Sequence, residues 1–167
     1  LATGATEYQP KEYLYGETDR IVTQVELSDR LETQGAEDLD SVVMIQCVHS
    51  REEPRNYCSR VCCTSALKHA LHLKEINPEL QIYILYRDMM AYGFHETFYT
   101  RARKANVIFI PYRVTAKPQV EVDQKNVNVS VRDPVIDRQL QIKADLLVLA
   151  TGVIPSLPPE LAETYGA

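Results

Sequence analysis

The middle of the chain alternates between short, continuous hydrophobic runs and segments with helical spacing. Four runs rich in β-branched residues have the character of strands buried on both faces, at residues 42–47, 81–86, 107–110 and 145–150. Apolar residues recur at helical spacing over 59–75, before Asn77-Pro78, and over 93–105. These segments predict two helices between the first three strands. Strands that alternate with helices in this way indicate a parallel sheet with right-handed crossovers.

Residues 118–143 show a different pattern, because apolar and polar side chains alternate within them. The segment 127–131 (VNVSV) is the clearest example, and a period of two is typical of an antiparallel strand with one face on a core. We therefore expect an antiparallel β-meander laid on the central sheet. The predicted fold class is α/β, a Rossmann-like three-layer domain with a central parallel sheet and an antiparallel β-meander.

The first 40 residues lack a strong pattern, and we expect a strap and linker there. Val25, Leu27 and Leu31 have partly helical spacing, which predicts one short helix over 24–31. The chain starts at Leu1 without Met and shows neither a secretory signal nor an apolar stretch long enough to cross a membrane. We interpret it as an internal piece of a larger cytoplasmic protein.

Composition narrows the possible functions. With 45% hydrophobic residues among 167, the chain can bury a core of its own. Its formal net charge is −5 and its Lys and Arg residues are scattered, a distribution that argues against nucleic acid binding. Nothing indicates an oxidising compartment, so we expect the cysteines to be reduced ligands or redox groups.

All four cysteines lie within 17 residues, as Cys47, Cys58, Cys62 and Cys63. Their spacing matches no common zinc motif, and a disulfide between the adjacent pair would be strained. Adjacent thiolates can instead bind different irons of a four-iron cluster. This pattern favours iron-sulfur ligation, while zinc, a disulfide, redox thiols and simple burial of small side chains stay open as alternatives. The predicted helix N-terminus should lower the pKa of the thiols.

The cysteines occupy the place of a phosphate-binding loop. A dinucleotide-binding unit needs the pattern Gly-x-Gly-x-x-Gly after its first strand, but this chain has no glycine between Gly35 and Gly93. Arg87 and Asp88 follow the second predicted strand, where Asp88 could still contact a ribose. We expect residues 41–152 to be a degenerate NAD(P)-binding-like domain, with a live NAD(P)-binding domain as the alternative.

The triplet Ala-Thr-Gly occurs twice, at residues 2–4 and 150–152, and it brackets almost the whole chain. A small residue, a hydroxyl and a glycine at the end of a parallel strand let the backbone approach a ligand closely. Two tight turns after strands are the alternative interpretation.

This bracketing of an α/β unit and a meander resembles the second nucleotide-binding domain of flavoproteins in the thioredoxin reductase and pyridine nucleotide disulfide oxidoreductase superfamily. More narrowly, the segments 43–48 (VMIQCV), 57–63 (YCSRVCC), 85–88 (LYRD) and 92–94 (YGF) closely resemble the A subunit of heterodisulfide reductase. One departure from that pattern is His49, where we would expect glycine, and it implies a bulkier loop.

The resemblance implies an FAD and iron-sulfur oxidoreductase subunit in which this chain is an electron-transfer module between flavin and partner subunits. It implies a 4Fe-4S cluster on the four cysteines, and partners that are the other subunits of a heterodisulfide reductase-like complex. FAD would be bound mainly by parts outside this chain. Residues 1–40 would be the strap from the FAD-domain side, and 153–167 the exit segment.

Thr3, Gly4, Thr151 and Gly152 would line one side of the FAD site in such a protein. Lys68 could approach the flavin ring and stabilise reduced, anionic FAD, although a solvated lysine on a helix is the alternative. We expect the isolated chain to be inactive. A degenerate docking module with a zinc or disulfide cysteine site is the alternative function.

Overall fold

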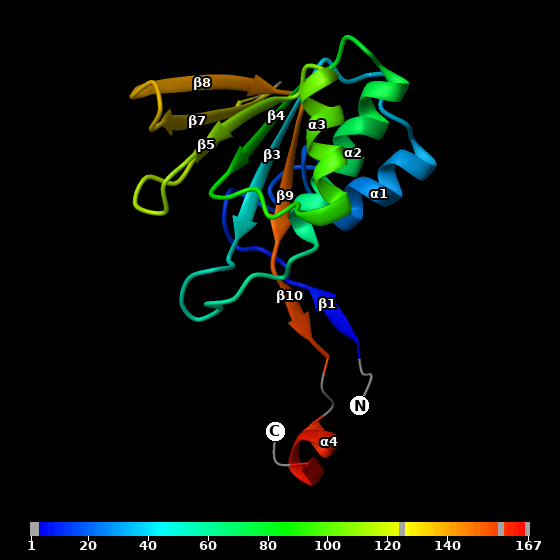
Figure 1. Ribbon diagram of the computed structural model, residues 1–167, viewed down its shortest axis with the longest axis vertical. Coiled ribbons are helices and arrows are strands. Elements are labelled where there is room, and N and C mark those ends of the chain that lie inside the picture. The colour runs from blue at the N-terminus through cyan, green and yellow to red at the C-terminus, as the bar shows by residue number, and fades with distance from the viewer. Residues whose placement is uncertain (1–3, 124–125, 157–158, 166–167) are drawn as a thin grey trace.

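The computed structural model describes residues 4–123, 126–156 and 159–165, and its centre is a parallel sheet (Figure 1). The sheet has five strands in the order β2-β9-β3-β4-β5, and every neighbouring pair is parallel. The strands are β2 Ile21–Thr23, β3 Ser41–Val48, β4 Gln81–Tyr86, β5 Ile108–Pro111 and β9 Leu146–Thr151. Because β9 lies inside the sheet and is covered on both faces, all of its residues are buried.

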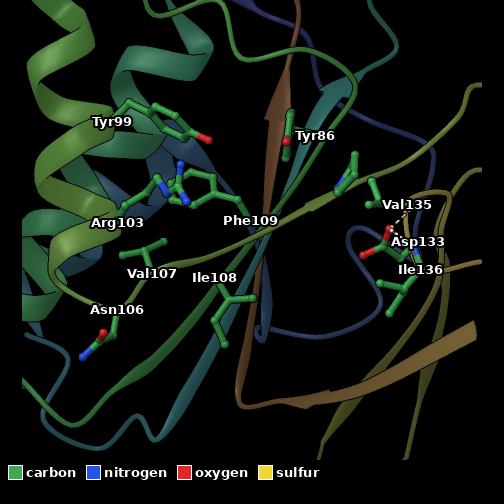
Figure 2. A pocket seen from close by; sticks show the side chains of 11 residues that line it. Tyr86, Tyr99, Arg103, Asn106, Val107, Ile108, Phe109, Asp133, Val135 and Ile136 are labelled. Atoms are coloured by element: carbon green, nitrogen blue, oxygen red, sulfur yellow. Dashed lines mark hydrogen bonds between the residues drawn. The ribbon is translucent and has the colours of Figure 1, made fainter. Parts of the chain in front are cut away.

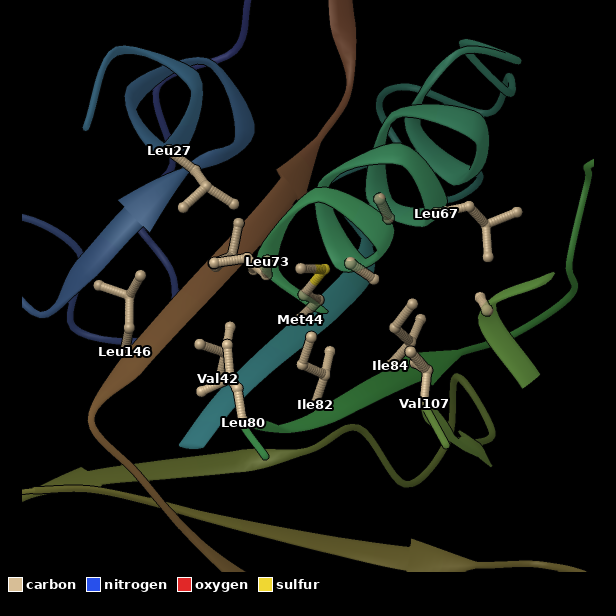
Figure 3. Packing of buried hydrophobic residues seen from close by; sticks show 14 of the residues in the cluster. Leu27, Val42, Met44, Leu67, Leu73, Leu80, Ile82, Ile84, Val107 and Leu146 are labelled. Carbon is tan, nitrogen blue, oxygen red and sulfur yellow. The ribbon is translucent and has the colours of Figure 1, made fainter. Parts of the chain in front are cut away.

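Three helices cover one face of this sheet, as Figure 1 shows. They are α1 Gln24–Thr33, α2 Cys62–Ile76 and α3 Glu96–Lys104, and a 3-10 turn, η1 Gly93–His95, precedes α3. On α2, Ala66, Leu67, Ala70 and Leu73 are fully buried, since this spacing places them on one face of a helix. They pack with Met44 and other sheet residues into the first core cluster (Figure 3).

The meander covers the opposite face of the sheet. It consists of β6 Gln119–Val122, β7 Val127–Asp133 and β8 Arg138–Ala144, which pair antiparallel in that order. Val127, Val129 and Val131 are buried and pack against Leu147 and Leu149 in a second core cluster. The predicted three-layer α/β fold with a parallel sheet and an antiparallel meander is confirmed.

The two predicted helices begin later than their hydrophobic patterns suggest. The helix predicted over 59–75 starts only at Cys62, because Arg60 has a φ of 63° and leaves the right-handed helical region. The helix predicted over 93–105 divides into η1 and α3. Local backbone geometry sets both helix starts, and the spacing of apolar residues does not predict it.

Residues 21–33 lie in the body of the domain, although the sequence analysis assigned them to a preceding strap. β2 pairs with β9 at one edge of the sheet, and Leu27 of α1 is fully buried in the first core cluster. Thr23 begins α1 with a capping box that it forms with Glu26. A strand of three residues is too short to give a periodic signal, so the sequence pattern did not reveal it.

A short antiparallel ribbon connects the two ends of the described chain. β1 Ala5–Glu7 pairs with β10 Val153–Pro155, and the ribbon extends below the sheet toward α4 Pro159–Tyr165 (Figure 1). Within the described residues, no helix is both long and apolar enough to cross a membrane.

Candidate metal and redox site

The fold gathers the cysteines where the central sheet meets α2. Cys47 lies near the carboxyl end of β3, and Cys62 and Cys63 are the first two residues of α2. Cys58 lies on the connecting loop, and all four cysteines are free. The carboxyl end of the first strand and the start of the next helix form the place where a nucleotide-binding scaffold holds a pyrophosphate.

The backbone of the cysteine loop, residues 47–61, is held in an uncommon conformation. Four non-glycine residues in or bordering it have φ angles in the left-handed region, which L-residues adopt only when their surroundings enforce it; they are Cys47 at 60°, His49 at 51°, Arg51 at 62° and Arg60 at 63°. The loop must therefore be fixed by contacts with the rest of the domain.

Each of three sulfur atoms contacts the surrounding backbone. The Cys62 thiol donates to the carbonyl of Thr151 at 3.4 Å, and the Cys63 thiol donates to the carbonyl of Asp88 at 3.8 Å. The backbone N–H of Arg60 donates to the sulfur of Cys58 at 3.4 Å. Strand ends β9 and β4 thus orient the two thiols that begin α2.

The cysteines lie close enough together for the charge of one thiolate to affect the pKa of another. Charges at Cys47 and Cys58 raise the pKa values of both Cys62 and Cys63, and Cys58 raises the pKa of Cys47. Even so, in the described part of the chain no three His, Cys, Asp or Glu side chains converge closely enough to hold a single metal ion.

The expectation that the helix N-terminus lowers the thiol pKa values is wrong for three cysteines of the metal-free chain. Burial is the largest effect, and it raises the pKa of Cys47 and Cys63 and takes that of Cys62 to about 12. The guanidinium of Arg51 acts in the opposite direction on Cys47. Burial outweighs the effects that lower these pKa values because protein rather than water surrounds most of each sulfur.

We expect alkylation of Cys62 in the metal-free, reduced chain to be about a thousandfold slower at pH 8 than alkylation of an ordinary thiol. Only the thiolate reacts, and a pKa moved from 9.0 to about 12 lowers the thiolate fraction by that factor. Residue-resolved mass spectrometry after timed iodoacetamide treatment measures the rate, which should rise with pH. A rate equal to that of a small free thiol would show that Cys62 is not buried in this way.

The residues that would serve a dinucleotide are engaged in other contacts. Arg87 donates to the carbonyls of Ser50 and Arg51, both at 3.2 Å, and Asp88 forms an ion pair with Arg51 at 2.6 Å. The acidic residue that could bind a ribose thus ties the cysteine loop to the end of β4. Val61 at the start of α2 makes no side-chain capping bond, so helix amides remain beside the cysteines.

A cavity of about 330 Å³ with a mixed polar and apolar lining lies on the α1 side of Cys62. Glu7, Gln24 and Thr151 line it together with His69. The His69 Nδ1 atom is buried without a hydrogen-bond partner. Thr151 is only 3% exposed, and its side chain lowers the pKa of Glu7 against the larger effect of burial. A buried ring nitrogen without a partner fits a ligand that offers a hydrogen bond. His69 carries no motif in the sequence, because its place in the cavity depends on how α1 packs against α2.

The described glycines of the two Ala-Thr-Gly triplets, Gly4 and Gly152, border the ribbon at its opposite ends. The carbonyl of Gly152 accepts from the N–H of Tyr8, and the carbonyl of Gly4 accepts from the N–H of Ser156. Thr3 lies outside the described residues. The ribbon between them therefore separates Gly4 from Thr151 and Gly152 by the length of its three paired positions.

Lys68 lies away from the cavity that Cys62 borders. Its ammonium group is over the ring of Phe98 on α3, 5.5 Å from the ring centroid, and its side chain is exposed. A cation above an aromatic ring is held by the ring quadrupole. Its role beside a flavin stays a prediction.

A separate groove of about 670 Å³ runs along the outer edge of β5. Tyr99 and Arg103 of α3 form one wall, and Val135 and Ile136 of the β7–β8 turn form the other (Figure 2). None of the cysteines lines this groove, so it does not belong to the candidate redox site.

Solved structures share this fold at low sequence identity. T. acidophilum thioredoxin reductase has a TM-score of 0.54 at 16% identity, over 92% of this chain and 43% of that chain. The NAD-dependent persulfide reductase from A. fulgidus has a TM-score of 0.54 at 19% identity, over 98% of this chain and 27% of that chain. These likenesses show a common fold and nothing finer.

Curated proteins give a closer match, whereas no protein-family model matches the chain. It is 33% identical to the A subunit of the ferredoxin:CoB-CoM heterodisulfide reductase of Methanosarcina acetivorans, over 93% of this chain and 25% of that protein. It is 36% identical to the iron-sulfur A subunit of the CoB–CoM heterodisulfide reductase of Methanocaldococcus jannaschii, over 93% of this chain and 26% of that protein.

The chain thus spans about a quarter of the length of these relatives. The resemblance to the A subunit of heterodisulfide reductase that the cysteine motif predicts is confirmed over 93% of the chain.

Proposed function

We propose that this chain is the electron-transfer module of an FAD and iron-sulfur oxidoreductase subunit, with Cys47, Cys58, Cys62 and Cys63 as the ligands of a 4Fe-4S cluster. One observation carries the proposal: four free thiols gather where a nucleotide-binding scaffold would hold a pyrophosphate. The relative from Methanocaldococcus jannaschii is named an iron-sulfur subunit, which supports the same assignment.

The order of the donors fits a cluster. In a 4Fe-4S cluster each cysteine binds a different iron, so the adjacent Cys62 and Cys63 can both be ligands. A single tetrahedral zinc ion prefers paired ligands with a residue or two between them. Such a cluster, when bound, takes up and releases single electrons.

The surrounding residues would hold these ligands and offset their charge. The uncapped start of α2 offers amides and a positive dipole end to Cys62 and Cys63. Arg51 and Arg87 lie close enough to Cys47 to lower its pKa against the effect of burial. The same burial keeps water from the sulfurs, which strengthens each of these electrostatic interactions.

FAD would be bound mainly by parts of the protein outside this chain. Gly4, Thr151 and Gly152 would form one side of its site, and the hydroxyl of Thr151 lies in the cavity beside Cys62. Residues 41–152, together with residues 21–33 that pack with them, would act as a degenerate NAD(P)-binding-like domain, between a shorter strap and an exit segment. Partner subunits of a heterodisulfide reductase-like complex would exchange electrons with this module.

Anaerobic reconstitution with iron and sulfide tests the proposal. The folded chain should take up about four irons and four sulfides, as expected for a cluster of this type, and show a broad visible absorption that reduction bleaches. Folded, reduced protein that takes up no iron would contradict it. One equivalent of zinc would favour a docking module, and saturable binding of NADH would favour a live NAD(P)-binding domain.

A further inference from the structure

We propose that His49 is a positioning residue that latches the cysteine loop onto residues 8–12, which directly follow the ribbon strand β1, an inference that rests on the proposed function of the cysteines. His49 is the residue that occupies the expected glycine position, two residues after Cys47. Its φ of 51° lies in the left-handed region, which glycine adopts most readily and histidine more readily than most side chains. Its imidazole makes contacts that a glycine could not make.

Two contacts hold the imidazole against residues 8–12, the segment that follows β1. The His49 ring stacks on the ring of Tyr8, with centroids 4.4 Å apart and planes 18° apart. Its Nδ1 atom lies 2.6 Å from a carboxylate oxygen of Glu12. The guanidinium of Arg55, farther along the loop, lies 4.3 Å from the centroid of the same Tyr8 ring. Tyr8 thus contacts the loop at two separated points.

The other strand of the ribbon holds the same loop. The Tyr57 hydroxyl donates to the carbonyl of Val153 at 3.0 Å, and the Val153 N–H donates to the Ser59 hydroxyl at 2.8 Å. The Tyr8 N–H donates to the carbonyl of Gly152 at 2.9 Å, so the segment that follows β1 is bonded to the residue that precedes β10. The cysteine loop consequently contacts both segments that follow an Ala-Thr-Gly triplet in the sequence, residues 8–12 and strand β10.

This arrangement couples the position of Cys47 and Cys58 to the position of the ribbon. Stacked rings and a partly buried hydrogen bond each contribute modestly to stability, but here they act on one loop whose backbone is strained at several residues. Cys63 depends less on the latch, because it is buried within α2 and bonded toward β4. Loss of the latch should expose the loop cysteines selectively.

Alkylation of the metal-free, reduced 167-residue chain tests this selectivity. The His49→Asn variant keeps a residue type that tolerates positive φ but removes the stacked ring. We expect the alkylation rates of Cys47 and Cys58 to rise about tenfold, which corresponds to about 1.4 kcal/mol of loop opening, while the Cys63 rate changes less than about twofold. Residue-resolved mass spectrometry gives each rate.

Tyr8 supplies a matched pair of variants. Tyr8→Phe keeps the stacked ring and should behave as the unmodified chain does, whereas Tyr8→Ala should reproduce the effect of His49→Asn. Arg132→Gln removes an ion pair to Asp137 in the meander and should leave all four rates unchanged. Equal rates in Tyr8→Ala and Tyr8→Phe would overturn the proposal.

A uniform rise at all four cysteines would also overturn it, because that result indicates global destabilisation. The readout needs no cluster, so the two proposals can fail separately. If the chain takes up no iron while His49→Asn still frees Cys58, the proposed function fails and the latch stands. If iron is taken up normally and the rates do not change, the latch fails alone.

Discussion

Replacing Cys62 with serine should lower iron uptake during anaerobic reconstitution by at least about tenfold. Substitutions that only support a metal ligand already cost roughly 10–100-fold in affinity, and serine removes a ligand outright. Cys62 is also the thiol that both the Thr151 carbonyl and the start of α2 orient. Iron and acid-labile sulfide per chain, together with the visible absorption, measure the effect.

A matched variant on the same helix controls for damage to α2. His72 is exposed on α2, so His72→Ala should retain full iron and sulfide uptake. Circular dichroism must show that both variants are folded. If Cys62→Ser binds as much iron as the unmodified chain, Cys62 is not a ligand, and the assignment of four cysteine ligands is wrong.

The second large effect concerns the free energy of unfolding. Two adjacent residues of α2, the buried Leu67 and the exposed Lys68, allow the contribution of core packing to be measured against a surface control. Leu67 is 0% exposed and belongs to the core cluster between the helices and the sheet (Figure 3). Leu67→Ala should lower the free energy of unfolding by about 2–5 kcal/mol, because it removes buried methyl groups and leaves a cavity. Urea denaturation followed by circular dichroism measures the change.

Lys68→Ala is the control for this prediction. Lys68 is exposed, and its ammonium group lies over the face of the Phe98 ring, so its removal should change the free energy of unfolding by less than about 1 kcal/mol. Both variants introduce alanine into the same helix turn, and alanine is a strong helix former. Similar losses in the two variants would contradict the packing of α2 against the sheet.

The reductase relatives are longer than this chain, which covers only about a quarter of each. The ribbon of β1 and β10 leads from the domain toward α4 (Figure 1). Gly4 and Gly152 border that ribbon.

The sequence alone predicted the layers of the fold correctly. Continuous β-branched runs identified β3, β4, β5 and β9. β3 and β9 are buried along nearly their whole length, whereas β5 is an edge strand on which Ile108 is exposed. The alternation over 127–131 identified the meander, because only every second residue of β7 faces the core. The absence of glycine after β3 also indicated that the nucleotide loop had been replaced.

Other features could not be predicted from local patterns. β2 has three residues, and its place in the sheet comes from pairing with β9, more than 120 positions away along the chain. The cavity beside Cys62 forms only because α1, α2 and the ribbon meet there. Contacts between distant segments create these features, so no sequence window contains them.

By itself, the sequence determined where the candidate site lies: four cysteines in a short interval of an α/β scaffold that lacks its phosphate loop. Only the tertiary structure decided the surroundings of those thiols, since burial raises the pKa of Cys47, Cys62 and Cys63. It also decided the contacts of His49, whose partners Tyr8 and Glu12 lie about 40 positions earlier. Desolvation and long-range contacts arise when segments distant in the sequence pack together, so they cannot be read from local sequence patterns.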